Sequence, residues 1–259
     1  MTEKVLYEVS NGVGVITLNR PEVHNAMDDE AAHLYKEALD HALSDDGVRA
    51  VLLRGAGKSF CSGRDTTMLG HRAKDESDYH FVLRHQQKRL VVLDSPKPFI
   101  GALKGAVIGG GCETALSCDI RISDTSLKMG LPEINYGILP DTGGTQLMTR
   151  LIGPSRTKYM VMTGERIDAR TALEWGAVDF VVAPEELDEK ALEIAKKIAA
   201  KPPLCLAMAK TMVDQTDAGA IRNGIAQELM AQSYLFKTED YHEARAALRE
   251  KRTPVYKGK

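Results

Sequence analysis

Apolar positions near the start of the chain alternate first at strand spacing and then at helix spacing. Val5–Val9 and Val13–Leu18 flank Asn11-Gly12 and predict a β-hairpin, because Asn-Gly favours a tight turn between strands. The apolar positions between Ala31 and Leu43 then recur at helical spacing. The acidic residues Asp28–Glu30 precede them and favour a helix N-terminus.

Further strands and helices alternate up to about residue 150. The apolar runs predict strands and helices in this order: a strand at Ala50–Leu53, a helix near Tyr79–Leu93, a strand at Phe99–Leu103, a helix at Gly111–Ser117, and strands at Asp119–Ile122 and Leu127–Gly130. A helix ending near Leu151 follows. Such alternation is typical of an α/β fold, with a mostly parallel, buried sheet and helices outside it.

The chain after about Pro184 reads as almost entirely helical. Helices are predicted at Leu187–Ile198, Leu204–Val213, Ala218–Phe236 and Thr238–Glu250. Because Pro202-Pro203 interrupt the pattern, we divide the chain into a core of residues 1–200 and a helical region of residues 201–259. Helices outside a sheet core often pack on a neighbouring subunit, so this region is expected to mediate oligomerisation.

Charge and hydropathy argue against nucleic acid and membranes as partners of this protein. The net charge of −2 gives no basic field for nucleic acid or an anionic membrane, and we expect neither as a partner. No apolar run approaches the ~20 residues that span a bilayer. The first residues lack a basic and then apolar signal peptide, so a cytoplasmic location is expected.

The four cysteines do not indicate metal or disulfide chemistry. Cys61, Cys112, Cys118 and Cys205 form no CxxC pair, and histidines do not cluster with them at ligand spacing. Reduced, packed thiols and no metal site are therefore expected. The segment Gly55–Ser59 superficially resembles a phosphate loop, but the pattern requires glycine where Leu52 stands.

Two glutamates follow turn signals in the middle of the chain. Glu113 comes after Gly109-Gly110-Gly111 at a predicted helix start, and Glu133 follows Pro132. Two carboxyl groups facing one pocket can act as acid and base, and bare N–H groups at a helix start can stabilise a developing negative charge. Together they suggest an enzyme that forms or quenches an enolate. Taken singly, Glu113 also fits a partner of the helix dipole, and Glu133 a solvated loop charge.

Two further segments carry candidate ligand-binding groups. In Lys58–Asp65, Gly63 lets the backbone bend and leaves N–H and C=O groups able to meet a ligand, although an ordinary strand-to-helix turn has the same composition. Asp141 precedes a predicted helix. It fits either the N-cap of that helix or a third carboxylate in the pocket.

In combination these motifs resemble the crotonase superfamily, also called the enoyl-CoA hydratase/isomerase family. The resemblance covers nearly the whole chain. It rests on Asn19–Pro21 with Asn25-Ala26, Phe60–Asp65, Gly105–Glu113, Cys118–Ile120, Pro132-Glu133, Gly143–Thr145 and Glu250–Arg252.

The resemblance implies a spiral of ββα units and a C-terminal helical region that trimerises, often into a hexamer of two trimers. It implies an acyl-CoA thioester as substrate, with the thioester oxygen held by the backbone N–H groups of Arg64 and Gly110. CoA would meet the backbone near Ser62, and its phosphates or adenine would approach Lys251. No cofactor is implied beyond CoA as part of the substrate.

Two positions depart from the family pattern. Many hydratases carry Ala at the position of Arg64, whose side chain could pair with a substrate carboxylate, a CoA phosphate or Asp65. Gln232 stands where some hydratases have an aromatic residue. Met68 and Leu69, with His71, Tyr79 and Phe81, are expected to line or cover the acyl pocket.

The reaction most favoured by the resemblance is hydration of a 2-enoyl-CoA by Glu113 and Glu133. Double-bond isomerisation that uses Glu113, Glu133 and Asp141 is the main alternative. Another acyl-CoA reaction, such as C–C cleavage or hydrolysis, and a non-catalytic role in binding CoA or RNA also remain open.

Overall fold

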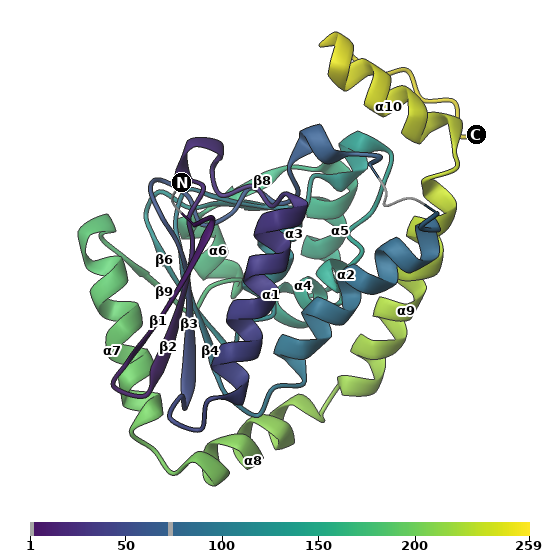
Figure 1. The fold of residues 1–259 in the computed structure, drawn as a ribbon. Coiled ribbons are helices and arrows are strands. Elements are labelled where there is room, and N and C mark those ends of the chain that lie inside the picture. The colour runs from purple at the N-terminus through teal and green to yellow at the C-terminus, as the bar shows by residue number, and fades with distance from the viewer. Residues whose placement is uncertain (1–2, 72–74) are drawn as a thin grey trace.

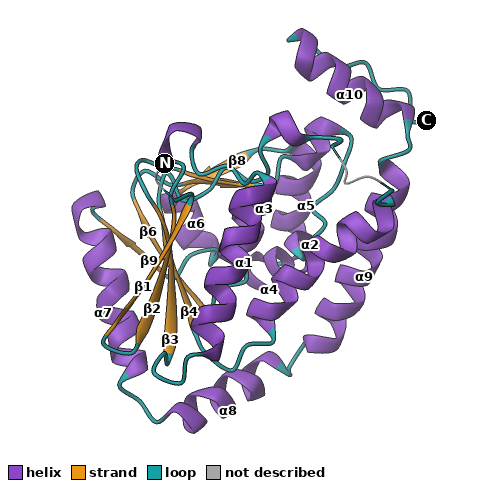
Figure 2. Ribbon diagram, viewed as in Figure 1, coloured by secondary structure: helices purple, strands orange, loops and turns teal. Residues whose placement is uncertain are grey.

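The computed structural model describes residues 3–71 and 75–259, in which one sheet has six strands and a second has three (Figures 1 and 2). The large sheet runs, in spatial order, β1 (Val5–Ser10), β2 (Val13–Leu18), β3 (Ala50–Gly55), β4 (Phe99–Leu103), β6 (Ile120–Asp124) and β9 (Phe180–Val182). β1 pairs antiparallel with β2, as the Asn-Gly hairpin predicts, and all other neighbours are parallel.

The small sheet is formed by three short strands from the middle of the chain. It consists of β5 (Ala106–Ile108), β7 (Lys128–Gly130) and β8 (Arg166–Asp168), with β7 parallel to β5 and antiparallel to β8. Each of the successions β4–β5–α3 and β6–β7–α4 sends one strand to each sheet before its helix. This confirms the expected α/β spiral of ββα units.

Helices surround both sheets. Their bounds are α1 Asp29–Ser44, α2 Asp78–Leu93, α3 Gly110–Leu116, α4 Gly144–Ile152, α5 Pro154–Thr163, α6 Ala169–Trp175, α7 Leu187–Ala199, α8 Pro203–Asp214, α9 Ala218–Leu235 and α10 Glu239–Glu250. Short 3-10 turns occupy Pro21–Val23, Thr66–Met68, Glu133–Tyr136 and Pro184–Glu186. The prediction lacked β5, β8, β9, α5 and α6. Each of these strands has only three residues, which is too short to show a hydrophobic period.

The inner strands of the large sheet, β2, β3, β4 and β6, are buried on both faces, as expected for parallel strands, whereas the edge strands β1 and β9 are partly exposed. α7 covers one face and packs against β3, β4 and β6, with Leu187, Ala191 and Ala195 fully buried. α1 covers β1 and β2 on the other face, where Leu39 and Phe99 belong to the main core (Figure 1). Two hydrophobic clusters, one on each face, therefore hold the large sheet in place.

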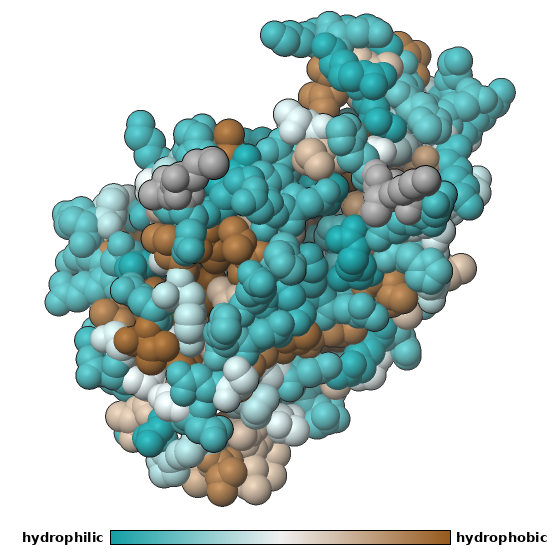
Figure 3. All heavy atoms as spheres, in the orientation of Figure 1, coloured by the Kyte–Doolittle hydropathy of each residue, from teal (hydrophilic) through white to brown (hydrophobic). Residues whose placement is uncertain are grey.

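The C-terminal helices lie in different places. α9 packs against α2 and α4, so residues more than 100 positions apart in sequence are neighbours (Figure 1). α10 contacts the turn Glu133–Tyr136 and extends from the upper part of the molecule. α8 forms the lower end, where apolar side chains gather on the surface (Figure 3). Among the described residues, no helix is both long enough and apolar enough to cross a membrane.

Candidate active site

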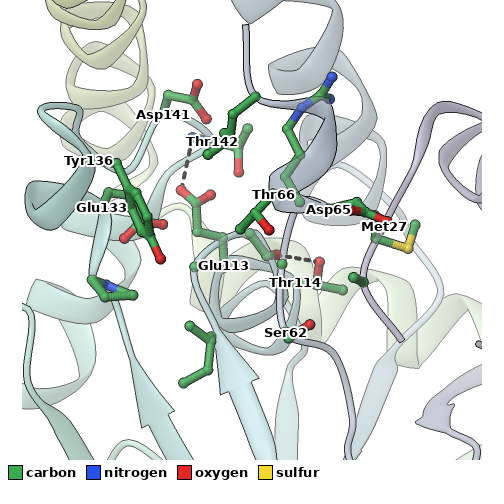
Figure 4. A pocket seen from close by; sticks show the side chains of 18 of the residues that line it. Met27, Ser62, Asp65, Thr66, Glu113, Thr114, Glu133, Tyr136, Asp141 and Thr142 are labelled. Atoms are coloured by element: carbon green, nitrogen blue, oxygen red, sulfur yellow. Dashed lines mark hydrogen bonds between the residues drawn. The ribbon is translucent and has the colours of Figure 1, made fainter. Parts of the chain in front are cut away.

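A cavity of about 900 Å³ opens beside the N-terminus of α3 (Figure 4). It brings together most of the residues predicted for the site: Ser62, Arg64, Leu69, Gly110, Glu113, Glu133 and Asp141. Phe81 also lines it. Within the described chain, Met68, His71 and Tyr79 lie outside this lining, and Lys251 ends α10 away from it.

Two backbone segments approach each other closely at the base of the cavity. Gly63 has φ of +88°, and a Cβ atom there would lie 2.7 Å from the carbonyl oxygen of Ile108 and 3.2 Å from the nitrogen of Gly110. Hydrogen bonds between Cys61 and its neighbours Ala106 and Ile108 hold the segments in register. Because Gly110 begins α3, its N–H group belongs to the first turn, which lacks intrahelical acceptors. The geometry places the Gly63–Arg64 backbone beside that N–H group.

Glu113 is oriented by the N-terminus of α4. The Glu113 side chain is buried on α3, and its Oε1 accepts hydrogen bonds from the N–H groups of Thr142 and Gly144, each at 2.9 Å (Figure 4). The N-cap of α4 is Gly143, so the first of the two roles open to Asp141, capping this helix, is excluded. The physical reason is that carboxylates from other helices take the N–H groups that an N-cap side chain would otherwise accept.

Glu133 occupies a different electrostatic environment in the same cavity. Glu133 follows Pro132 at the start of a 3-10 turn, and its Oε2 is buried with no hydrogen-bond partner in the described structure. Burial, and then repulsion from Glu113, raises the pKa of Glu133 well above its ordinary value. Figure 4 shows both carboxyl groups facing one space, with Asp141 nearby. One carboxyl group accepts two N–H bonds and the other favours its proton, as an acid–base pair requires.

Glu228 on α9 is a buried carboxyl group that the sequence analysis missed. Its oxygens accept from the N–H of Gly143 at 2.7 Å, and from the N–H and hydroxyl of Thr145 at 3.1 and 2.5 Å. Glu113 and Glu228 therefore share the N–H groups of four consecutive residues at the start of α4. The sequence does contain a signal for it, because Glu228 shares the buried face of a predicted helix with Ile225 and Leu229.

The titration of Glu228 gives a testable pH dependence of stability. Burial, and then Glu113, raises the pKa of Glu228 to about 8 from an ordinary value of 4.5. Between these values the folded protein keeps a proton that the unfolded chain has lost, so the stabilisation present below pH 4.5 declines up to about pH 8. Glu228→Gln cannot titrate. Urea denaturation gives the free energy of unfolding of each protein. The value for the wild type minus the value for Glu228→Gln should fall across this range by at most about 1.4 kcal/mol per pH unit. A constant difference would contradict this.

The Arg64 side chain pairs with the start of α1. Its Nη2 lies 3.5 Å from Oδ1 of Asp29, and its guanidinium stacks 4.9 Å from the ring centroid of Phe81. Asp65, one of the partners considered for Arg64, pairs with Arg20 instead, at 3.3 Å.

His85 completes the surroundings of the Arg64 side chain. Burial is the main cause that lowers the pKa of His85 to about 4, so its ring is neutral at physiological pH. Nδ1 lies 2.8 Å from the carbonyl oxygen of Phe81 and Nε2 lies 3.2 Å from Nη1 of Arg64. These partners assign the proton to Nδ1, because a carbonyl needs a donor and a guanidinium needs an acceptor.

The structure also shows the surroundings of Gln232 and of the buried cysteines. Gln232 is buried in the cavity lining, and its Oε1 accepts from the N–H of Leu139 at 3.0 Å. This amide therefore fixes the loop before α4. Cys61, Cys112 and Cys118 are buried free thiols, and burial raises the pKa of Cys61 to about 11, which fits packed rather than reactive cysteines.

Comparison with known proteins identifies the family. A family model described as enoyl-CoA hydratase/isomerase matches residues 8–259. The short-chain-enoyl-CoA hydratase of Clostridium acetobutylicum is 37% identical over 96% of this chain and 95% of its own. The 2,3-dehydroadipyl-CoA hydratase of Escherichia coli is 35% identical over 95% of each chain. The crystal structure of carnitinyl-CoA hydratase from Mycobacterium avium superposes with a TM-score of 0.88, at 31% identity over the whole of both chains. The chain therefore belongs to the enoyl-CoA hydratase/isomerase family, the crotonase superfamily.

Proposed function

We propose that this protein is a 2-enoyl-CoA hydratase that adds water across the C2–C3 double bond of a thioester. The observation that carries the proposal is the pair of carboxyl groups, Glu113 and Glu133, facing one cavity beside the close approach of Gly63 and Gly110. The names of its relatives support the same reaction class.

In this mechanism the two carboxyl groups have opposite tasks. Glu113, whose Oε1 is held by two N–H bonds, is oriented to take a proton from water as the oxygen adds to C3. Glu133, whose surroundings favour its protonated form, is suited to deliver a proton to C2. The enolate-like charge on the thioester oxygen would rest on the N–H groups of Arg64 and Gly110. The residues act without a further cofactor, since CoA enters as part of the substrate.

Binding of CoA is proposed at the open side of the cavity. Ser62 lines the cavity, and its own N–H donates to the carbonyl oxygen of His24. That bond fixes the backbone against which the nucleotide would lie. Lys251 is exposed at the end of α10, where a phosphate could reach it.

The distinguishing experiment is mass spectrometry of the products from a panel of linear and cyclic enoyl-CoA thioesters. Hydration adds the mass of one water and leaves the thioester intact. An unchanged mass with a moved double bond would indicate isomerisation. Release of free CoA would indicate hydrolysis or cleavage, and either result would replace the hydratase proposal.

Replacement of the Arg64 side chain tests whether only its backbone N–H takes part. Arg64→Ala removes the pairing with Asp29 and the stacking on Phe81 but keeps the N–H group. We expect kcat for a neutral enoyl-CoA to stay within about tenfold of the wild-type value, well short of the ~10²-fold loss that follows removal of an oxyanion-hole donor. Steady-state kinetics will show this, and a loss of 10²-fold or more with intact folding by circular dichroism would assign the side chain a direct role.

Isomerisation is the second candidate because Asp141 lines the same cavity. Repulsion from Asp141 is also among the causes that raise the pKa of Glu133, so a third acid is available for moving a proton along the acyl chain. In an isomerase, Asp141→Asn would abolish conversion of 3-enoyl or dienoyl thioesters. In a hydratase, hydration would survive that change.

The assembly is proposed to be a trimer or a dimer of trimers. α8 and α9 expose large apolar side chains, including Leu204, Met208, Met212, Met230 and Tyr234. Exposed apolar patches of this kind are typical of subunit contacts. Light scattering coupled to size exclusion will give the mass, and a monomer at micromolar concentration would overturn this part of the proposal.

A further inference from the structure

The cavity extends between α1 and α2, where basic side chains line it. His85, Lys88 and Arg89 lie three and four positions apart on α2 and therefore share one face. Ala32 and Tyr35 of α1 line the same part, and Nζ of Lys88 donates to the carbonyl oxygen of Ala32 at 3.4 Å. α1 and α2 are neighbours in the fold (Figure 1). We call this part of the cavity, lined by these five residues, the α1–α2 arm.

Arg89 is a buried cation in this arm without a protein counterion. Its side chain lines the cavity although the residue is only 9% exposed. Its Nη2 donates to the carbonyl oxygen of Gly110 at 3.2 Å and its Nη1 to Oγ of Ser117 at 3.4 Å, while Nε has no acceptor. Within residues 3–71 and 75–259, no carboxylate lies within ion-pair distance of it. A guanidinium is always charged, so its burial favours an anion from outside the protein.

Two more groups reinforce this preference. Lys88 is half-buried and also has no carboxylate at ion-pair distance in the described chain; burial, and then Arg84, lowers its pKa. The hydroxyl of Tyr35 is buried, lines the cavity and has no hydrogen-bond partner among the described residues. The attraction of Asp29 acts on Lys88, but Asp29 already pairs with Arg64. The arm thus offers two positive charges and a hydroxyl donor.

The other charges in the cavity do not neutralise the arm. His85 is neutral, Glu113 and Glu133 form the proposed reaction centre, and Asp141 lines the cavity without an ion pair to Lys88 or Arg89 among the described residues. Arg89 is held against the first turn of α3, which begins at Gly110. An anion that reaches Arg89 is therefore deep in the cavity, on the side of the reacting acyl group rather than at the exposed nucleotide end.

We propose that the α1–α2 arm binds a carboxylate at the far end of the acyl group, so that the preferred substrates are CoA thioesters of unsaturated dicarboxylic acids. A carboxylate matches the geometry of the Arg89 guanidinium and accepts a hydrogen bond from the hydroxyl of Tyr35. The inference rests on the proposed function, because it concerns the acyl group of the same thioester.

The test compares two thioesters with the same number of acyl carbons, 2,3-dehydroadipyl-CoA and 2-hexenoyl-CoA. The wild-type protein should show a kcat/KM ratio that favours the carboxylate by about tenfold or more, because hydrogen bonds between charged groups are stronger than those between neutral ones. Arg89→Met should lower that ratio by about tenfold to 10²-fold, mainly through KM for the dicarboxylic substrate. Arg89→Lys should keep part of it. Arg170→Met, which removes an exposed guanidinium on α6, is the matched control and should leave the ratio unchanged.

Different outcomes separate this inference from the proposed function. Equal kcat/KM for both thioesters in the wild type, or an equal loss on both in Arg89→Met, overturns it, since the latter means that Arg89 only supports Gly110. If neither thioester is hydrated, the proposed function fails instead. Isothermal titration calorimetry with the saturated thioesters adipyl-CoA and hexanoyl-CoA then tests carboxylate binding in the α1–α2 arm without any turnover. Only adipyl-CoA should lose affinity in Arg89→Met, and an equal change for both thioesters overturns the inference. If Arg89→Met does not fold, Tyr35→Phe and Lys88→Met give the same comparison.

Discussion

Glu133→Gln is expected to lower kcat for hydration of a short 2-enoyl-CoA by about 10²–10⁴-fold, with little change in KM, because an amide cannot deliver the proton to C2. Gln has nearly the same shape as Glu, so the loss reports proton chemistry rather than packing. The buried Oε2 of Glu133 has no hydrogen-bond partner in the described structure, so the substitution breaks no hydrogen bond at that atom. Single-turnover kinetics with purified variants will measure the change.

Glu113→Gln makes a matched companion for this experiment. Both N–H bonds from Thr142 and Gly144 end on Oε1 of Glu113, and an amide oxygen can accept them in the same place. The variant therefore keeps the link to α4 but loses the base, and we expect a kcat loss of about the same order. Glu189→Gln, an exposed change on α7, serves as the control. Near-normal turnover in either cavity variant would remove the acid–base assignment.

The pH dependence of kcat provides a second test of whether Glu133 acts as the acid. A raised pKa means that the group keeps its proton to higher pH than an ordinary glutamate. If Glu133 is the acid, kcat falls as pH rises through this raised pKa, and the residual activity of Glu133→Gln should lack that limb. A profile that loses activity only on the acidic side, in wild type and variant alike, would show that Glu133 does not act in its protonated form.

Much of the fold follows from local sequence patterns, and the candidate pair of glutamates follows from turn signals. The β1–β2 hairpin at Asn11-Gly12 and the long helices α1 and α2 are predictable, because their hydrophobic periods extend over enough residues. The three-residue strands β8 and β9 are not, since they exist only by pairing with β7 and β6. Strand pairing of this kind depends on tertiary contacts that a local pattern does not contain.

The electrostatics of the site were the least predictable part. Glu228 stands 83 positions from Thr145 in sequence, and it meets the N-terminus of α4 only because α9 packs there. The same packing explains why Asp141 is not the cap. Arg64 pairs with Asp29, 35 positions earlier, rather than with the adjacent Asp65. Each of these contacts depends on the arrangement of separate helices, whereas the sequence argument considered neighbours along the chain.

Gly63→Ala is expected to reduce kcat by about 10²–10³-fold, the range seen when an oxyanion-hole donor is lost. A Cβ atom at this position would lie 2.7 Å from the carbonyl oxygen of Ile108 and 3.2 Å from the nitrogen of Gly110, so the two backbone segments must separate. The N–H groups of Arg64 and Gly110 would then lose the relative position that the proposed oxyanion hole requires. Because the acid–base pair lies elsewhere in the cavity, this loss tests the proposed oxyanion hole independently of the glutamates.

Gly176→Ala separates the steric effect from backbone strain. Gly176 has nearly the same positive φ, +87° against +88° for Gly63, but a Cβ atom there meets only the carbonyl oxygen of Leu151 at 3.4 Å. Both variants should lose about 1–2 kcal/mol of stability from the left-handed backbone, measured by thermal or urea denaturation. Only Gly63→Ala should also lose the large factor in kcat. If both variants lose activity equally, strain alone explains the effect, and the close approach of Gly63 and Gly110 has no special part in the reaction.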